Sequence, residues 1–270
     1  MKRSTQGIGL AAALLLAGGS AHATVSFDTA LASPNALAAD PAASHSGSNA
    51  SWFNGSGNPQ GGWVTDTEND IELGLRAKQR GVSTVYWTSG DLYTVPTGTV
   101  SHRSIWNYEF SVDVRPGGGS SGATFGSLRA GGDTVTLTVS DAHGNTATFN
   151  PLTKWGDNAG YGSGAGDDSA SPPTTMSGKD GSANANDWAG QNSENLSFGD
   201  SPLAGHYNAW SANSYTFTLS VLDSNSNVLA SDTMVVDSVP EPATLSLLAA
   251  GCFGLIGLRR RSHGASASAV

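Results

Sequence analysis

The sequence predicts an all-β fold, an antiparallel β-sandwich or jelly roll, with a processing segment at each end of the chain. Apolar and polar residues alternate with period two in several segments between residues 71 and 236, a pattern typical of strands with one buried face. Short turns rich in Asp, Asn and Gly separate neighbouring segments, as in β-hairpins. Such strands favour antiparallel sheets whose apolar faces pack together.

Five segments carry the alternation, and we expect them to pair antiparallel. They span residues 71–76, 108–115, 134–139, 215–221 and 228–236. The turn 141–145 leads the third segment into a return strand, and the turn 223–227 joins the fourth to the fifth. The side chains that we expect in the core are Phe110, Val112, Leu137, Phe217 and Leu219.

Two stretches of the region 24–238 lack a clear strand pattern. Residues 24–43 are rich in alanine but interrupted by Pro34 and Pro41, so a short helix and an irregular arm are both open. Residues 151–194 are rich in Gly, Ser, Asn and Asp without periodicity, which predicts a long flexible loop. No second domain boundary is visible, so 24–238 is expected to form one exported domain.

The N-terminus has the pattern of a secretory signal peptide. Lys2 and Arg3 precede an apolar run over residues 8–17, and Ala21 and Ala23 then form the small-x-small site that signal peptidase recognises. We expect residues 1–23 to be removed by signal peptidase during export.

The C-terminus combines a short motif, an apolar helix and a basic stop. Val239 and the motif Pro240, Glu241 and Pro242 are followed by the uncharged segment 243–258 and by Arg259, Arg260 and Arg261. The arginines are expected to stay in the cytoplasm, which places 24–238 beyond the inner membrane. At about 24 Å, the helix 243–258 is a marginal transmembrane anchor. Residues 262–270 form a short polar tail.

Residues 239–261, VPEPATLSLLAAGCFGLIGLRRR, resemble the PEP-CTERM sorting signal of Gram-negative bacteria. In that family an exosortase, a membrane cysteine transpeptidase of exopolysaccharide-producing bacteria, reads the motif. The resemblance implies that the tail is removed and that the protein reaches the cell surface or the extracellular polymer matrix. Segments 72–77, 106–111 and 191–198 also resemble a group of PEP-CTERM proteins with no assigned activity.

Composition and charge exclude several classes of protein. Of the 270 residues, 13% are charged and 38% are hydrophobic, which fits neither a solvated coiled coil nor a disordered chain. The net charge is -9, and about -13 over 24–238, so we expect no nucleic acid partner. Cys252 is the single cysteine of the chain, so an intrachain disulfide is impossible.

Four alternating carboxylates are the candidate metal ligands: Asp66, Glu68, Asp70 and Glu72. In an extended segment they would share one side, and calcium binds clustered carboxylate oxygens. The stretch lacks the glycine and terminal glutamate of an EF-hand, so a solvated strand face is the preferred interpretation. The four histidines of the exported part lack the spacing of a zinc pair. We therefore expect no cofactor, with calcium as the alternative.

Tryptophans in loop-like segments are the candidate carbohydrate contacts: Trp155, Trp188 and Trp210. Their rings could stack on the sugars of an exopolysaccharide, but covering the ends of the sandwich is the preferred interpretation. Residues 117–122, GGGSSG, fit both G-x-G-x-x-G and, from Gly118, G-x-S-x-G. Both motifs require a following helix, and we expect none over 123–132, so both matches are attributed to chance.

The sequence thus predicts a non-catalytic secreted or surface protein, sorted by exosortase to the envelope or exopolysaccharide matrix, with a structural or adhesive role. A carbohydrate- or calcium-binding module and a glycan-active hydrolase remain the alternatives. Before processing, the chain is expected to be held in the inner membrane.

Overall fold

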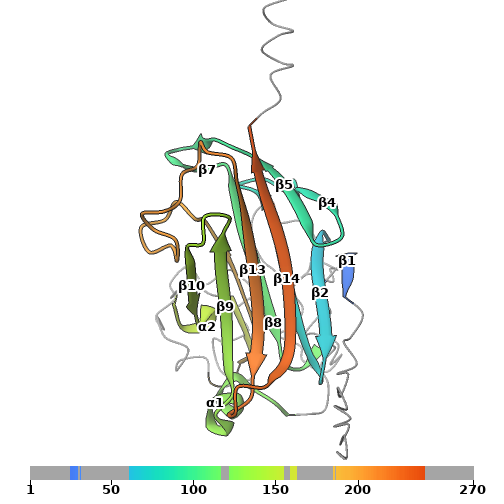
Figure 1. Cartoon of the computed structure of the whole chain (residues 1–270). Helices are drawn as coiled ribbons and strands as arrows, with labels where there is room; N and C mark the ends of the chain where they lie inside the picture. The colour runs from blue at the N-terminus through green and yellow to red at the C-terminus, as the bar shows by residue number, and fades with distance from the viewer. Residues whose placement is uncertain are drawn as a thin grey trace, which may run out of the picture.

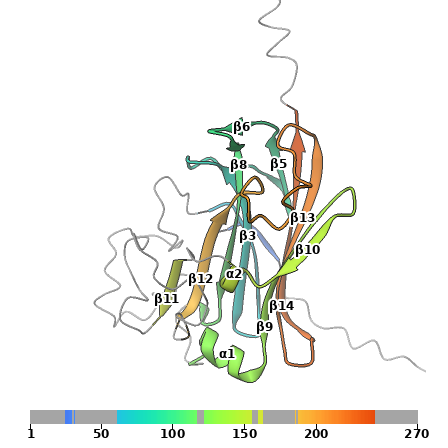
Figure 2. The ribbon, with the colours of Figure 1, turned by 90° about the vertical axis from the view of Figure 1, so that its left-hand side faces the viewer.

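The computed structural model describes residues 25–29, 31, 61–116, 122–154, 159–162, 185 and 187–240. The predicted signal peptide 1–23, the sorting helix 243–258 and the tail 262–270 lie outside these residues. Within them, the structure is mostly β and contains two six-stranded sheets that pack face to face (Figures 1 and 2).

The first sheet is antiparallel throughout. Its strands, in spatial order, are β1 (Ser26–Thr29), β2 (Trp63–Glu68), β3 (Ile71–Gln79), β8 (Trp106–Asp113), β12 (Asp187–Glu194) and β11 (Ala159–Gly162). β8 pairs with β3 on one side and with β12 on the other, and the β8–β12 pair joins residues more than 70 positions apart in the sequence.

The second sheet is antiparallel except at one pair. Its strands, in spatial order, are β10 (Thr146–Phe149), β9 (Thr134–Asp141), β13 (Asn213–Leu222), β14 (Val228–Val239), β5 (Leu92–Pro96) and β4 (Trp87–Ser89). β14 and β5 run parallel, whereas the sequence predicted only antiparallel pairs. The two strands are distant in sequence, so no hairpin constrains their relative direction.

Four short elements complete the described chain. The strands β6 (Thr99–Val100) and β7 (Arg103–Ser104) form a small hairpin near the end of β14. The helices α1 (Phe125–Gly131) and α2 (Pro151–Lys154) are short, and α1 lies at the opposite end of the sandwich (Figure 1).

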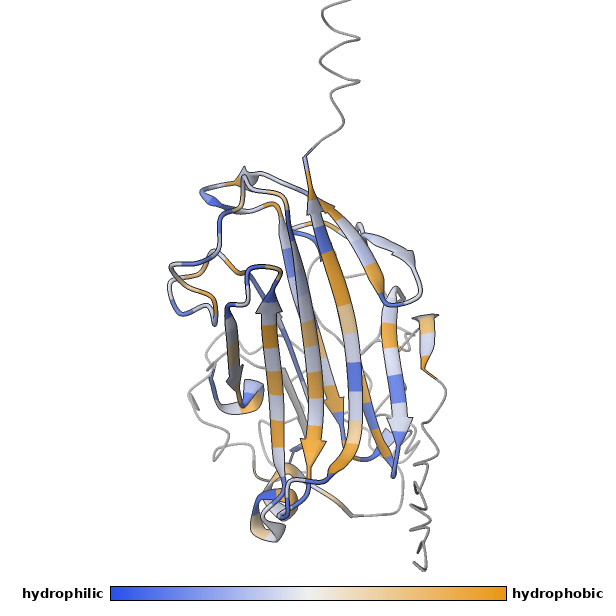
Figure 3. Cartoon of the chain, in the orientation of Figure 1, coloured by the Kyte–Doolittle hydropathy of each residue, from blue (hydrophilic) through white to orange (hydrophobic). Residues whose placement is uncertain are grey.

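The core between the sheets is formed by the alternating apolar residues, as predicted. Phe110, Val112, Leu137, Phe217 and Leu219 are all fully buried. The alternation is visible along β9, β13 and β14 in Figure 3. The five predicted segments pair antiparallel in β3–β8, β9–β13 and β13–β14. Thus, period-two patterning correctly predicted both the strands and the faces that they bury.

The prediction of a long flexible loop over residues 151–194 is wrong at both ends of that range. Its first residues form α2 and β11, and its last eight form β12, which lies between β8 and the edge strand β11. Gly190 explains part of this placement, because a Cβ there would lie 2.8 Å from Leu152 and 3.1 Å from Phe125. A glycine therefore allows α1 and α2 to pack closely on β12.

Candidate functional site

The outer face of the first sheet is polar yet buried. In β3, Leu73, Leu75 and Ala77 face the second sheet. The residues that alternate with them point away from it, and these include Arg76 and Lys78. Both are at most 4% exposed. The same face of β8 carries Glu109, which lies directly opposite Arg76 in the strand register and is fully buried. We call Arg76, Lys78 and Glu109 the charged triad.

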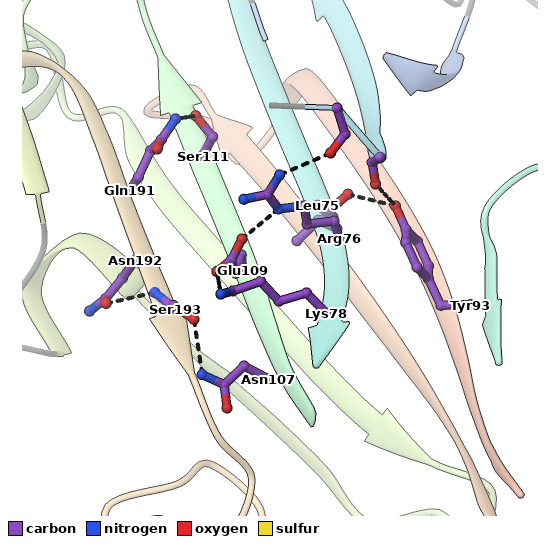
Figure 4. Close-up of polar contacts among 12 residues, drawn as sticks. Leu75, Arg76, Lys78, Tyr93, Asn107, Glu109, Ser111, Gln191, Asn192 and Ser193 are labelled. Carbon is purple, nitrogen blue, oxygen red and sulfur yellow. Dashed lines mark hydrogen bonds and ion pairs between the residues drawn. The ribbon is translucent and has the colours of Figure 1, made fainter. Parts of the chain in front are cut away.

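The triad is held by short contacts (Figure 4). Arg76 Nε donates to Glu109 Oε2 at 2.5 Å, and Lys78 Nζ lies 3.5 Å from Glu109 Oε1. Arg76 Nη1 also donates to the carbonyl of Gly61 at 2.9 Å, and its guanidinium stacks 4.1 Å from the ring centre of Trp63. One carboxylate therefore joins two cations, and an aromatic ring covers one of them.

Burial affects both cations of the triad. Desolvation lowers the pKa of Arg76 and of Lys78, and the negative charge of Glu109 opposes this shift in both. The carboxylate of Glu109 thus stabilises the charged forms of two side chains that burial disfavours. The three side chains of the triad therefore hold one another in place.

Neutral polar pairs extend this face from β8 to β12. Gln191 Nε2 donates to Ser111 Oγ at 2.9 Å, and Asn107 Nδ2 donates to Ser193 Oγ at 3.0 Å (Figure 4). On the other side of the triad, the hydroxyl of Tyr93 in the second sheet donates to the carbonyl of Gly62 at 2.6 Å. The polar face therefore ties neighbouring strands of the first sheet together, whereas the bond between the two sheets comes from Tyr93, whose ring lies in the core.

Asp113 marks the far end of the same face. It lies opposite Glu72 in the register of β3 and β8 and is 1% exposed. Burial raises the pKa of its carboxyl to about 7, with the negative charge of Glu72 adding to the effect and the amide of Arg115 opposing it. At neutral pH this carboxyl is therefore close to half protonated.

Asp113 is expected to make stability depend on pH. In the unfolded chain its carboxyl titrates near its ordinary value of 3.8. The stabilisation from the protonated form is thus fully present below about pH 4 and is lost as the pH rises through about 7. At about 1.4 kcal/mol per pKa unit, the loss between pH 5 and pH 7 is about 2 to 3 kcal/mol.

Asp113→Asn tests this expectation by urea unfolding at both pH values. An asparagine keeps the oxygen that accepts from the Arg115 amide at 2.8 Å but does not ionise. The variant should show a smaller pH dependence than the wild type. Some dependence should remain, because burial also raises the pKa of Asp232. Asp133→Asn, near the end of α1, is the matched control, and an unchanged pH dependence in Asp113→Asn would contradict the assignment.

The four carboxylates predicted to share one side do not do so, because they belong to a hairpin. β2 ends at Glu68, and Asn69 and Asp70 form the turn with φ values of 53° and 60°. Asp66 pairs with Leu73 and faces the core near Asp232, whereas Glu72 pairs with Thr67 on the opposite face. In the described part of the chain, no group of three or more His, Cys, Asp or Glu residues is arranged to hold a metal ion.

The three candidate tryptophans are placed differently. Trp188 lies in β12 and is 6% exposed, with the Arg115 guanidinium 4.4 Å from its ring centre. Its ring is therefore not available to a sugar, contrary to its predicted loop position. Trp210 is 69% exposed in a turn, and Trp155 lies outside the described residues.

The expectation that residues 123–132 form no helix is wrong, because α1 lies within them. It spans Phe125–Gly131, and Thr124 is its N-cap residue. The Thr124 side chain accepts a hydrogen bond from the Ser127 amide, and Ser127 Oγ accepts one from the Thr124 amide. This reciprocal cap nucleates a helix despite the glycines. Residues 117–121 lie outside the described residues.

Sequence reasoning missed the charged triad as a buried group. Part of the signal was present in the charges at residues 76 and 109, which alternate with core residues on two predicted strands, whereas Lys78 lies beyond the predicted segment 71–76. Such alternation ordinarily indicates a solvated face, so the pattern gave the correct side of the sheet but not its burial.

The sorting motif begins at the end of β14. Val239 is the last strand residue and Pro240 the last described one, whereas Glu241, Pro242 and Arg259, Arg260 and Arg261 lie outside, as do Ala21 and Ala23. Among the described residues, no helix has the length and apolar character needed to cross a membrane.

Comparison with protein families finds a match at the C-terminal end of the chain. Residues 238–261 match the family described as the PEP-CTERM protein-sorting motif. The comparisons with curated proteins and with solved structures found no match. The match confirms the predicted resemblance, and its range contains the motif 240–242 and the arginines 259–261. The chain therefore carries a PEP-CTERM sorting motif at its C-terminal end, which implies export and processing by exosortase.

Proposed function

We propose that this protein is a non-catalytic secreted or surface protein that exosortase releases to the envelope or the exopolysaccharide matrix, where it has a structural or adhesive role. The observation that carries the proposal is the sorting motif, which begins where β14 ends. A folded β-domain is thus joined directly to a removable tail.

The described polar groups support a structural rather than a catalytic role. The charged triad is buried and its members bind one another, so its carboxylate is already engaged by two cations. The carboxylates Asp66 and Glu72 point to opposite faces of the sheet, which gives the calcium alternative no common site. The burial of Trp188 likewise removes one of the rings on which the carbohydrate alternative depended.

Glu241→Ala tests the sorting proposal. Glu241 is the charged residue of the motif, so its loss is expected to leave an unprocessed form in the inner membrane. The measurement is the mass of the protein and its distribution between membrane and extracellular fractions, in cells with and without the exosortase. Glu68→Ala, in the distant β2–β3 hairpin, is the control and should be processed normally.

Identical mass and location for Glu241→Ala and the wild type would overturn the sorting proposal. The non-catalytic role has a separate test, incubation of the purified protein with the exopolysaccharide of its own host. Turnover of that polymer would replace the structural role with the hydrolase alternative.

A further inference from the structure

One end of the sandwich is built around the last residue of β14. The amide of Thr97 donates to the carbonyl of Val239 at 2.8 Å, and the amide of Gly98 donates to the carbonyl of Ala209 at 2.6 Å. These bonds fix two loops beside the end of β14. We call this end, formed by residues 97–103, 204–212 and Val239, the apex; it lies opposite α1 (Figure 1).

The chain leaves the apex directly toward the apolar segment 243–258. Three residues, Pro240, Glu241 and Pro242, separate Val239 from Ala243. Fully extended, this connection spans about 14 Å at most. The headgroup layer on each side of a bilayer is about 5 to 8 Å thick. If the segment 243–258 spans the membrane, the apex is therefore held at the headgroup layer.

The exposed side chains of the apex suit that location. Trp210 is 69% exposed, Val100 is 42% exposed and Val239 is 39% exposed. Trp210 lies beside the apex backbone, because a Cβ on Gly98 would be 3.7 Å from its ring. Tryptophan is enriched at the membrane–water interface, where an apolar ring and a polar N–H are both accommodated.

The charge of the apex differs from that of the whole domain. The apex loops 97–103 and 204–212 contain His102, Arg103 and His206 but no Asp or Glu, although Asp237 and Glu241 flank Val239 in the sequence and 24–238 carries a net charge of about -13. The opposite end bears Glu68 and Asp70 in the β2–β3 turn and Asp223 in the β13–β14 turn. The apex loops are therefore less acidic than the opposite end, so anionic headgroups repel the domain least at the apex.

We propose that, in the membrane-anchored precursor, the apex rests on the non-cytoplasmic surface of the inner membrane, with the Trp210 ring inserted among the lipid headgroups. This inference rests on the proposed function, since it requires the C-terminal anchor. It adds a binding surface in the folded domain, outside the sorting motif itself.

The test is quenching of tryptophan fluorescence by brominated lipid. The full chain is reconstituted into vesicles of phosphatidylethanolamine and phosphatidylglycerol whose acyl chains carry bromine close to the headgroup. Trp210→Phe is expected to lower the quenched fraction about two-fold or more relative to the wild type. Trp87→Phe is the matched control, because Trp87 is also exposed, at 38%, but lies on the edge strand β4.

Two results would overturn the proposal while the chain still floats with the vesicles. One is equal quenching in the wild type and Trp210→Phe. The other is an equal loss in Trp87→Phe, which would show that the quenching does not report on the apex. Both leave the sorting proposal standing, since Glu241→Ala tests that separately. A chain that does not float with vesicles overturns the anchor and this inference together.

A processing assay in cells distinguishes between lipid and the processing enzyme as the partner that contacts the apex. If the wild type is not quenched in vesicles but Trp210→Phe slows the appearance of the mature form, the apex contacts the processing enzyme and the lipid proposal is wrong. Quenching that depends on Trp210 in vesicles without any enzyme supports the lipid surface.

Discussion

Glu109→Gln is expected to lower the free energy of unfolding by about 3 to 5 kcal/mol, because it leaves two buried cations without their carboxylate. Glutamine has the size of glutamate, so the packing of β8 is preserved. The side chains of Arg76 and Lys78 are at most 5% exposed, so water cannot readily replace the lost carboxylate. The measurement is urea unfolding of the wild type and the variant at pH 7.

A second substitution separates lost charge from altered packing. Adding Lys78→Met to Glu109→Gln removes one of the two cations and should recover part of the lost stability. Glu68→Gln, at the partly exposed end of β2, is the matched control and should change stability by less than about 1 kcal/mol. If Glu109→Gln is as mild as this control, the triad is not a buried charge cluster in solution.

Strands with a core face could be predicted from sequence because their pattern has a local cause. In β13, Tyr215, Phe217, Leu219 and Val221 alternate with Thr and Ser, and all four are buried. Successive side chains of a strand point to opposite faces, so this pattern alone determines which residues meet the second sheet. The turn 223–227 was predictable for a similar reason, since Asp223 accepts from the amides of Asn225 and Asn227.

The strand β12 could not be predicted in the same way. Its sequence, DWAGQNSE, has no apolar alternation, and both of its neighbours, β8 and β11, supply backbone partners from elsewhere in the chain. A strand formed mainly by backbone pairing leaves little trace in composition. The buried pairs Gln191–Ser111 and Asn192–Glu194 satisfy polar side chains that would otherwise disfavour burial.

The outcome for the four acidic residues has a separate cause. The prediction that they share one side assumed a single extended segment. Asn69 and Asp70 instead have positive φ values, which Asn and Asp readily adopt in a tight turn. A two-residue turn reverses the chain, so Asp66 and Glu72 belong to different strands. The burial of Arg76 could not be predicted from the sequence either, because it depends partly on the Trp63 ring of the neighbouring strand.

Phe217→Ala is expected to lower the free energy of unfolding by about 3 to 5 kcal/mol. The ring is fully buried at the centre of β13, between Val139 on β9 and Met234 on β14. It reaches across the core to Tyr108 of the first sheet, with ring centres 4.7 Å apart. Its loss therefore leaves a cavity that extended strands on both sides cannot readily close.

Thr216→Ala is the matched control for Phe217→Ala, because Thr216 precedes it on the same strand and points to the outer, partly exposed face. This control should lower stability by less than about 1 kcal/mol. A cost for Phe217→Ala as small as that would place the ring outside a packed core and contradict the contact between the sheets. A large cost with an unchanged slope against urea would show that the variant loses packing but keeps its fold. That result would identify the contact between Phe217 and Tyr108 as part of what holds the two sheets together.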